Sequence, residues 1–290
     1  MAAAAIDEAV RNAVCVGVDV DKIAGLDNFC WPDPIESEKT PDGKFKLAQL
    51  VRANRELERI CRAYRLPCVS GKDSMKNDYG KGPNKISIPP TLLFSLFGDH
   101  PDVRNSATSD LKNAGDKLYL VGESLDELGA SELAFMMTET GQTAGIGGNV
   151  PLLTDPERLF SSYRALSKAI NSGVVKTAHD CSEGGVGVAL AEMCIGGRIG
   201  ANIDIDGTGN TSTWARLWGE SLGRIIIAVS PQNNAKFLEL MAGHTTTLLG
   251  EVAATTQLSI VDGFDDLVSI EVNDLVTSWQ GTLDLTGGIV

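Results

Sequence analysis

The segment from His179 to Gly185 reads His-Asp-Cys-Ser-Glu-Gly-Gly and runs directly into a stretch with helical periodicity. Two adjacent glycines let a backbone approach a ligand closely, and a helix N-terminus offers free N–H groups and a partial positive charge to an anion. A carboxylate at Asp180, just ahead of the turn, could hold Mg²⁺ against the same phosphates. The alternative is a helix cap, in which Ser182 or Asp180 accepts first-turn hydrogen bonds and the glycines only shape the turn.

Three further segments carry residues that could bind a nucleotide or a metal ion. Residues 70–74, Ser-Gly-Lys-Asp-Ser, are predicted as a loop similar in kind to a phosphate loop but without P-loop spacing, so a turn with a solvated Lys72 is the alternative. Glu8 and Asn12 are four residues apart on one face of a predicted helix, which suits a hard cation or a solvated helix edge. Asp27 lies in a predicted loop, where an Asx turn is the ordinary reading.

Several common catalytic arrangements are missing from the chain. The sequence contains no G-x-S-x-G, no Walker lysine–serine pair and no H-E-x-x-H. Its three histidines, His100, His179 and His244, are too few and too scattered for a histidine-rich metal site.

Composition and charge exclude further classes of protein. The 290 residues carry a net charge of −13, which argues against a nucleic-acid-binding surface, although a bound metal ion could still attract a nucleotide. No apolar run approaches the roughly 18 residues of a membrane span. Six cysteines without C-x-x-C spacing are typical of reduced thiols. We expect a cytoplasmic protein without membrane or nucleic-acid partners.

The elements that must position these residues fall into two parts, a domain at 1–115 and a domain at 116–290, divided by a polar, turn-forming stretch at 99–116. The first part shows an amphipathic helix near 7–16, a longer one at 44–65 and a strand within 86–97. The second part alternates strands and helices, which predicts an α/β or α+β sandwich. Its predicted strands are 117–122, 174–178, 201–205, 224–230, 246–251 and 257–261, and its predicted helices 156–171, 184–193, 213–218 and 233–241. The first domain has little sheet for its helices, so we expect strands from another subunit or from a part encoded elsewhere.

Six segments, taken in order, resemble one enzyme family. They are Glu8-Ala-Val-Arg-Asn12, Leu26-Asp-Asn-Phe-Cys-Trp31, Val69-Ser-Gly-Lys-Asp-Ser-Met75, Gly129-Ala-Ser-Glu-Leu133, His179-Asp-Cys-Ser-Glu-Gly-Gly185 and Leu217-Trp-Gly-Glu-Ser-Leu-Gly-Arg224. Together they resemble the C-terminal half of phosphoribosylformylglycinamidine synthase, of the aminoimidazole-ribonucleotide-synthetase-like superfamily. The resemblance implies an N-terminal α/β domain that forms part of a barrel, followed by a C-terminal α/β sandwich. It also implies strands and a metal-binding aspartate upstream, so this chain looks like a separately encoded or cut piece.

The resemblance assigns roles to the metal and nucleotide residues of the second part and the first helix. Glu8, Asn12 and Asp180 match the family's magnesium ligands around a bound ATP or ADP, and Ser182 matches a nucleotide contact. No catalytic residue is implied in this chain, because the family's catalytic histidines and lysine lie in the other half.

The segment at 69–75 matches the family less uniformly. Asp27 and Gly71 match positions that touch ATP in the shorter synthases, and Ser74 one that touches substrate. Lys72 replaces a metal-binding Asn of the shorter enzymes and agrees with the long, single-chain type, so we count it among the predicted nucleotide contacts.

The implied reaction is the ATP-dependent amidation of formylglycinamide ribonucleotide in purine biosynthesis, with ammonia delivered by a glutaminase. ATP phosphorylates the amide oxygen, and ammonia then displaces phosphate. The implied partners are the N-terminal half of the synthase and the glutaminase, in an oligomer without which the chain is inactive. Two alternatives remain. One is a non-catalytic, nucleotide-binding scaffold; the other is a cousin such as selenophosphate synthetase or thiamine-phosphate kinase, whose own ATP motifs are missing here.

Overall fold

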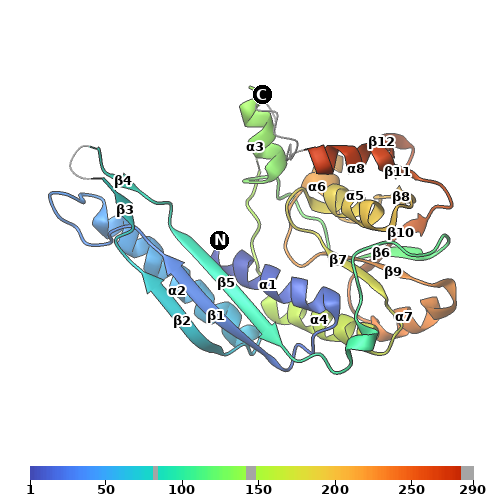
Figure 1. Cartoon of the computed structure of the whole chain (residues 1–290), viewed down its shortest axis with the longest axis horizontal. Coiled ribbons are helices and arrows are strands. Elements are labelled where there is room, and N and C mark those ends of the chain that lie inside the picture. The colour runs from blue at the N-terminus through green and yellow to red at the C-terminus, as the bar shows by residue number, and fades with distance from the viewer. Residues whose placement is uncertain (81–83, 142–147, 282–290) are drawn as a thin grey trace.

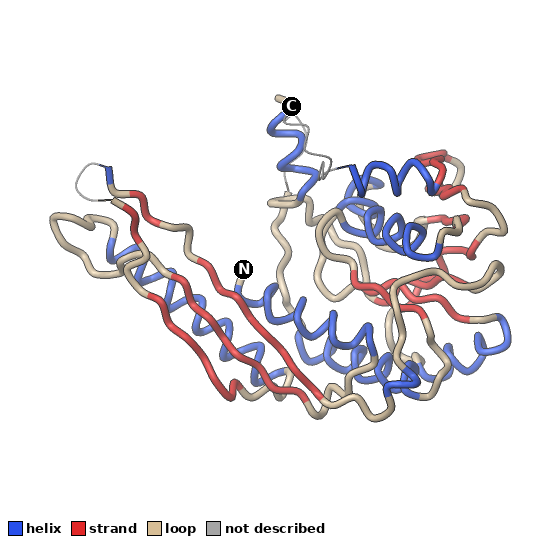
Figure 2. The backbone as a smooth tube through the Cα atoms, viewed as in Figure 1, coloured by secondary structure: helices blue, strands red, loops and turns tan. Residues whose placement is uncertain are grey.

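The computed structural model describes residues 1–80, 84–141 and 148–281. Two sheets dominate it: a three-stranded sheet near the N-terminus and a seven-stranded sheet built from the rest of the chain (Figure 1). The tube in Figure 2 shows the three long strands of the first sheet running side by side, away from the layered second part. Within the described residues, no helix is both long and apolar enough to cross a membrane.

The first sheet has the strand order β2-β1-β5, with β1 parallel to β2 and antiparallel to β5. Helix α2 covers one face, and α1 runs beside the edge strand β5 (Figure 1). The elements of this part are α1 (Ala2–Val16), β1 (Ile23–Cys30), α2 (Gly43–Ala63), β2 (Cys68–Ser74), β3 (Asp78–Tyr79), β4 (Ile86–Ser87) and β5 (Thr91–Gly98). A short η2 turn (Val103–Asn105) leads toward the second part.

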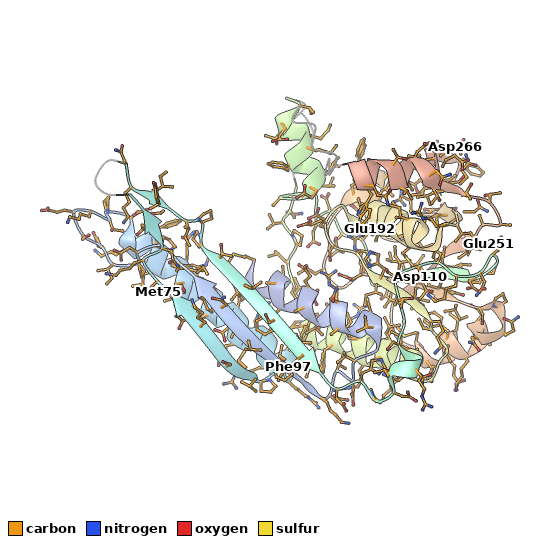
Figure 3. The ribbon with its side chains drawn as sticks, viewed as in Figure 1. Met75, Phe97, Asp110, Glu192, Glu251 and Asp266 are labelled. Carbon is orange, nitrogen blue, oxygen red and sulfur yellow. The ribbon has the colours of Figure 1, made fainter. Side chains whose placement is uncertain are left out.

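Side-chain alternation along β5 separates the two faces of this sheet. Leu92 and Phe94 are buried against the helices, whereas Leu93 and Phe97 point to the opposite face and are 58% and 54% exposed. Successive side chains of a strand point to opposite faces, so this pattern gives the sheet one covered and one open face. Figure 3 labels Phe97 near the end of β5.

Two predicted loops are strands, and those predictions were wrong. The segment around Asp27 is the central strand β1, and residues 70–74 belong to the edge strand β2. Both sequences contain Gly, Asp and Asn or Ser, which favour turns in isolation. Pairing of β1 on both sides supplies backbone hydrogen bonds that outweigh this local preference.

The seven-stranded sheet has the order β12-β11-β8-β10-β6-β9-β7. Its strands are β6 (Lys117–Val121), β7 (Thr177–Asp180), β8 (Ala201–Asp204), β9 (Ile225–Val229), β10 (Thr246–Val252), β11 (Gln257–Asp262) and β12 (Asp265–Glu271). Its helices are α3 (Glu132–Glu139), α4 (Pro156–Asn171), α5 (Gly185–Gly197), α6 (Thr213–Trp218), η3 (Pro231–Asn233), α7 (Asn234–Leu240) and α8 (Val272–Gly281). The sequence did not predict α3, β12 or α8, and it placed β7 three residues too early.

Strand β9 explains how this sheet is layered. All five of its residues are buried, as expected for a strand with helices on both faces. Ile225 and Ile227 join the core under α4 and α7, while Ile226 joins the core under α5 and α8. The result is an α/β sandwich, with α4 and α7 on one side of the sheet and α5, α6 and α8 on the other (Figure 1).

Helix α1 connects the two parts. Its buried residues Ile6, Val10 and Val14 share one hydrophobic core with Ile60 of α2 and Phe160 of α4. The same helix also packs against β5 and β7. Because α1 touches both sheets, it fixes where the residues on its exposed side lie relative to the end of β7.

Candidate functional site

Asp180 is the last residue of β7 and is 7% exposed. Its Oδ2 accepts a hydrogen bond of 2.8 Å from the Ser182 hydroxyl, and its Oδ1 lies 3.7 Å from His179 Nδ1. His179 in turn contacts Glu192 of α5 through Nε2 at 2.8 Å; Glu192 is labelled in Figure 3. The predicted pair of Asp180 and Ser182 is therefore brought together in one small polar group.

The charge states of this group follow from opposing effects. Burial alone would raise the pKa of Asp180, but His179, the Arg11 charge and the Ser182 hydroxyl outweigh it and lower the pKa to about 2. Burial would lower the pKa of His179, yet the two carboxylates of Asp180 and Glu192 raise it to about 9. Near neutral pH, Asp180 is an anionic carboxylate beside a cationic imidazole.

Glu8 and Asn12 lie on the exposed side of α1, as the helical spacing predicted. They line a groove of about 590 Å³ between α1 and β5, whose apolar wall includes Leu93 and Phe97. Neither side chain makes a hydrogen bond or ion pair with any residue in the described part of the chain. The groove thus presents two oxygen-bearing side chains that the fold itself leaves unused.

Helix α1 also packs against strand β7, whose last residue is Asp180. Glu8, Asn12 and Cys15 follow the i, i+4, i+7 spacing of one helix face. Cys15 is buried, and burial together with the Asp180 charge raises the pKa of its thiol. Helix α1 and strand β7 pack directly together, so the residues predicted as metal ligands lie on two neighbouring elements.

Arg11 links α1 to the segment that follows β7. Its Nη1 donates to the carbonyl oxygen of Cys181 at 2.5 Å, and its Nε lies 2.8 Å from Asp7 Oδ2. The side chains of Asp7 and Arg11 are 0% and 2% exposed. Asp7 Oδ1 also accepts hydrogen bonds from Tyr64, the residue that follows α2, at 2.6 Å and from Tyr163 of α4 at 2.7 Å. This buried network fixes α1, and with it Glu8 and Asn12, relative to the backbone next to Asp180.

The glycine turn before α5 has a structural reason as well as a possible binding role. Gly184 and Gly185 adopt φ of 74° and 64°, and a Cβ on Gly185 would lie 2.4 Å from the Gly219 carbonyl oxygen. Glu220 Oε1 accepts from the Gly184 N–H at 2.9 Å and from the Glu132 N–H, at the start of α3, at 2.8 Å. The Glu220 carboxylate therefore already accepts a hydrogen bond from one of the N–H groups that were expected to bind phosphate.

The backbone on either side of Glu220 is held by the fully buried Arg224. Arg224 donates to the carbonyl oxygens of Gly219 and Ser221 and to the Ser124 hydroxyl. Desolvation by burial lowers the pKa of Arg224, whose hydrogen-bond partners in the described chain are carbonyl and hydroxyl oxygens. The Arg224 guanidinium thus orders the loop that carries Glu220 toward the N-terminus of α5.

The four predicted contacts on the first sheet do not share one face. The register pairs Asp27 with Gly71, whose missing Cβ would lie 2.9 Å from the Asp27 carboxylate, on the face covered by α2. Lys72 and Ser74 hydrogen-bond to each other on the opposite, open face. They also lie on β2, two strands away from β5 and hence about 10 Å farther from α1. Glu8, Asn12 and Asp180 form one candidate group, and the β1–β2 residues form another.

The donor set fits a hard metal ion. Within residues 1–80, 84–141 and 148–281, no group of three or more His, Cys, Asp or Glu side chains could hold a metal. Mg²⁺ in nucleotide sites is commonly held by one or two carboxylates together with phosphates and water. Glu8, Asn12 and Asp180 supply oxygen ligands only, so they suit Mg²⁺ accompanied by a nucleotide rather than a metal cage made by protein alone.

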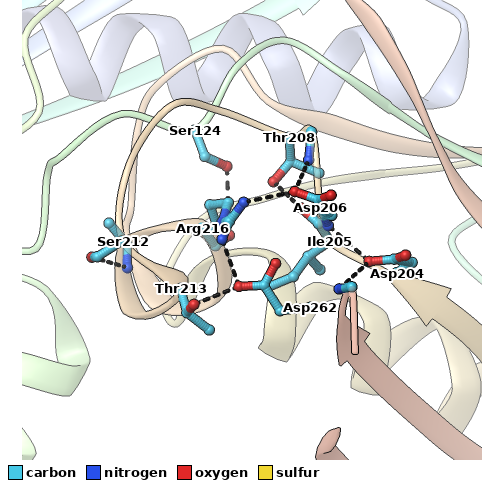
Figure 4. Close-up of polar contacts among 12 residues, drawn as sticks. Ser124, Asp204, Ile205, Asp206, Thr208, Ser212, Thr213, Arg216 and Asp262 are labelled. Carbon is cyan, nitrogen blue, oxygen red and sulfur yellow. Dashed lines mark hydrogen bonds and ion pairs between the residues drawn. The ribbon is translucent and has the colours of Figure 1, made fainter. Parts of the chain in front are cut away.

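A second acidic cluster is satisfied internally. Asp262 accepts from Thr213 and from Arg216, whose other nitrogen lies 3.2 Å from Asp206 (Figure 4). Asp204 accepts from the backbone N–H groups of residues 206 and 263 (Figure 4). The cluster joins the loop before α6 to the end of β11 and is structural.

Sequence reasoning did not single out Arg11, Asp7 or Glu220. Asp7 immediately precedes Glu8, and Arg11 immediately precedes Asn12. The i, i+4 spacing of Asp7 and Arg11 is typical of an ion pair on a helix surface. For Asp7 and Arg11, the helical pattern was a usable signal, because it places both residues on the buried side of α1 with Val10 and Val14.

A family model described as "AIR synthase related protein, C-terminal domain" matches residues 113–263, just over half of the chain. The chain belongs to the AIR synthase-related family. Its match begins before β6 and ends after β11, so it covers β7, the glycine turn and α5.

Comparisons with known proteins show how far the likeness extends. The phosphoribosylformylglycinamidine synthase subunit PurL of Deinococcus radiodurans is 34% identical over 97% of this chain, which spans 36% of that protein. The structure of Thermotoga maritima PurL complexed with FGAR has a TM-score of 0.70 at 18% identity, over 95% of this chain and 42% of that one. The hydrogenase maturation protein HypE in complex with ATP has a TM-score of 0.66 at 13% identity, over 93% of this chain and 79% of that one. The predicted fold class is thereby confirmed, whereas this chain spans about a third of the curated relative.

Proposed function

We propose that this chain is a part of phosphoribosylformylglycinamidine synthase and serves the ATP-dependent amidation of formylglycinamide ribonucleotide, in the cytoplasm. The observation that carries the proposal is the 34% identity to a PurL subunit across 97% of the chain. Thermotoga maritima PurL, which has the same fold, is described in complexes with FGAR, ATP, ADP and AMPPCP. The domains proposed for this chain are residues 1–115 and 116–290.

The nucleotide site that we propose lies along the exposed side of α1, from its groove with β5 to the end of β7. Glu8, Asn12 and Asp180 would hold Mg²⁺, and Ser182 would contact the nucleotide. The support is the unpartnered state of Glu8 and Asn12 among the described residues, and the low pKa that keeps Asp180 ionised. When bound, the metal would neutralise phosphate charge, which phosphoryl transfer requires.

On the first sheet we propose contacts of a different kind. Asp27 and Gly71 would contact ATP on the α2 side of β1 and β2. On the open face, Lys72 would contact a phosphate group and Ser74 would contact the substrate. Because these pairs lie on opposite faces, a single small ligand could not touch all four without reaching around the edge strand β2.

The open face of the first sheet supports a partner proposal. Leu93 and Phe97 stand exposed on it, and proteins normally cover such apolar surface. We propose that the N-terminal half of the synthase covers this face, in an oligomer that also includes the glutaminase. Without that partner the chain would self-associate, and light scattering of a stable, folded monomer at micromolar concentration would contradict this.

The activity can be tested by reconstitution. The chain alone should not form the amidine product from ATP, Mg²⁺, ammonia and formylglycinamide ribonucleotide, and it should gain this activity when the rest of a PurL subunit is added. Turnover by the chain alone, or no gain on addition of the missing part, would count against the proposal.

The nucleotide site can be tested by titration calorimetry with ADP and Mg²⁺. Asp180→Asn should abolish Mg²⁺-dependent binding, because it removes the one buried anionic ligand. Glu183→Gln is the matched control, since Glu183 is an exposed carboxylate in the same turn and is no proposed ligand. Equal ADP affinity for wild type and Asp180→Asn would remove the metal assignment.

A second candidate function is a nucleotide-binding scaffold without a catalytic role. It is favoured by the Asp7–Arg11 network, which ties the site to three helices of the core. In that case ADP should bind tightly and stabilise the chain, while Asp180→Asn in the reconstituted complex should leave the rate of amidation unchanged. A loss of turnover in the reconstituted Asp180→Asn complex would favour the catalytic role.

A further inference from the structure

Two cysteines meet at the edge of the first sheet. Cys61 lies in the last turn of α2 and Cys68 is the first residue of β2, and their Sγ atoms are 3.8 Å apart. A disulfide needs a separation of about 2.05 Å, so a small side-chain movement would bring the sulfurs to bonding distance.

The connection between the two cysteines is held by packing on both sides. The Leu66 N–H donates to the Cys61 carbonyl oxygen at 2.8 Å, and the Pro67 carbonyl oxygen accepts from the Gly25 N–H of β1 at 2.9 Å. Tyr64 and Leu66, which lie between them, are 0% and 3% exposed. The approach of the thiols is therefore a property of the folded core and not of a loose loop.

We propose that Cys61 and Cys68 form a redox modification site, in which a peroxide-class oxidant joins the end of α2 to the start of β2 by a disulfide. Hydrogen peroxide would first oxidise the exposed Cys68 to a sulfenic acid and release one water. The Cys61 sulfur would then attack the Cys68 sulfur, forming the S–S bond. The hydroxide of the sulfenic acid leaves, takes up the proton of the Cys61 thiol and becomes the second water. The two thiols lose two electrons in total, which the peroxide gains.

Local electrostatics set the rate of this reaction. Burial and the neighbouring sulfur raise the pKa of Cys61 to about 12, and burial together with the nearby Asp27 charge raises that of Cys68. Thiolates are the reactive form, so the bond should form slowly near neutral pH and faster as the pH rises. Basic thiols are also poor leaving groups, so the disulfide once formed should resist reduction by other thiols.

The remaining cysteines provide internal comparisons. Cys15, Cys181 and Cys194 are buried, and Cys30 is half-buried with its sulfur beside Asn28. Within the described chain, Cys61 and Cys68 are the pair with contacting sulfurs. Oxidation should therefore stop after the loss of two of the six thiols.

The test is mild hydrogen peroxide treatment of the folded chain at pH 7 and pH 8.5, followed by thiol counting and peptide mapping. Trypsin cuts after Arg62 and Arg65, which lie between the two cysteines, so only a disulfide keeps the two peptides together. We expect free thiols to fall from six to four, faster at pH 8.5, with linked peptides about 2 Da lighter than their sum.

Two variants decide the assignment. Cys68→Ser should retain all five of its thiols over the same interval, while Cys30→Ser should still lose two. Thiol loss in Cys68→Ser equal to that in wild type, oxidation of Cys68 onward to the sulfinic acid without linkage, or no reaction at either pH would overturn the proposal. These readouts do not depend on nucleotide binding or amidation.

Discussion

A single substitution in the buried ion pair between Asp7 and Arg11 should affect both the stability of the fold and the candidate nucleotide site. We consider Asp7→Asn, which keeps an oxygen to accept the Tyr64 and Tyr163 hydroxyls but removes the charge 2.8 Å from Arg11 Nε. Arg11 is 2% exposed, so its guanidinium would be left in the core without a counter-charge.

The size of the effect follows from that burial. Removing one partner of a buried ion pair costs about 3–5 kcal/mol, because the other charge stays desolvated. A domain is typically stable by about 5–15 kcal/mol, so the loss should lower the urea midpoint of unfolding strongly. Removing both charges, with Asp7→Asn and Arg11→Met together, should cost no more than either single change.

The assay is urea unfolding followed by circular dichroism for wild type, both single variants and the double variant, with ADP–Mg²⁺ titrations of each folded protein. Both variants that lack Arg11 lose the hydrogen bond to the Cys181 carbonyl oxygen beside Asp180. The double variant should therefore regain stability relative to the sum of the singles, yet still bind ADP–Mg²⁺ more weakly. Tyr163→Phe is the control, since it removes a hydrogen bond worth about 1 kcal/mol and leaves Arg11 in place.

Additive costs of the two single changes would refute this reasoning. They would mean that Asp7 and Arg11 do not neutralise one another in the folded chain. Unchanged ADP affinity in the double variant would separately refute the link from Arg11 to the site.

Other predictions concern the turn and the surface. Gly185→Ala should destabilise by roughly 2–3 kcal/mol in thermal or urea unfolding, from positive φ and the close Gly219 oxygen, whereas Gly243→Ala, with φ of 84° and open space, should cost only about 1 kcal/mol; equal costs would contradict the close-contact argument. The Arg164 hydrogen bond lowers the pKa of Asp21, so this pair should add stability above the unfolded carboxyl pKa and lose it as the pH falls through the folded one. Because both side chains are partly exposed, Asp21→Asn should cost under about 1 kcal/mol at pH 7, and this cost should shrink as the pH falls through the folded-state pKa of Asp21; a cost that does not fall on acidification would contradict the charge argument.

The sequence determined the sandwich part of the fold in most of its elements. Helices α4 and α6 begin and end at the predicted residues, because an N-cap of Asp155 or Ser212 precedes each helix and a clear apolar stripe follows. The five buried residues of β9 likewise form a short apolar run rich in β-branched residues, which favours a buried strand. Caps, apolar stripes and apolar runs are local signals, because each depends only on residues that are close together in the sequence.

The first sheet could not be predicted in the same way. The segments around Asp27 and Lys72 contain turn-forming residues, and they are strands because neighbours distant in the sequence pair with them. The choice of face for Asp27 and Lys72 is also a matter of register between two strands. No pattern within either segment specifies that register.

The candidate site divides along the same line. Spacing alone put Glu8 and Asn12 on one helix face, and composition alone marked the turn at Gly184 and Gly185. Only the tertiary structure decided that Arg11 joins α1 to the end of β7, and that Glu220 fills an N–H expected to be free. These contacts link residues separated by 170 and 36 positions, and such pairings depend on how the sheets and helices pack together.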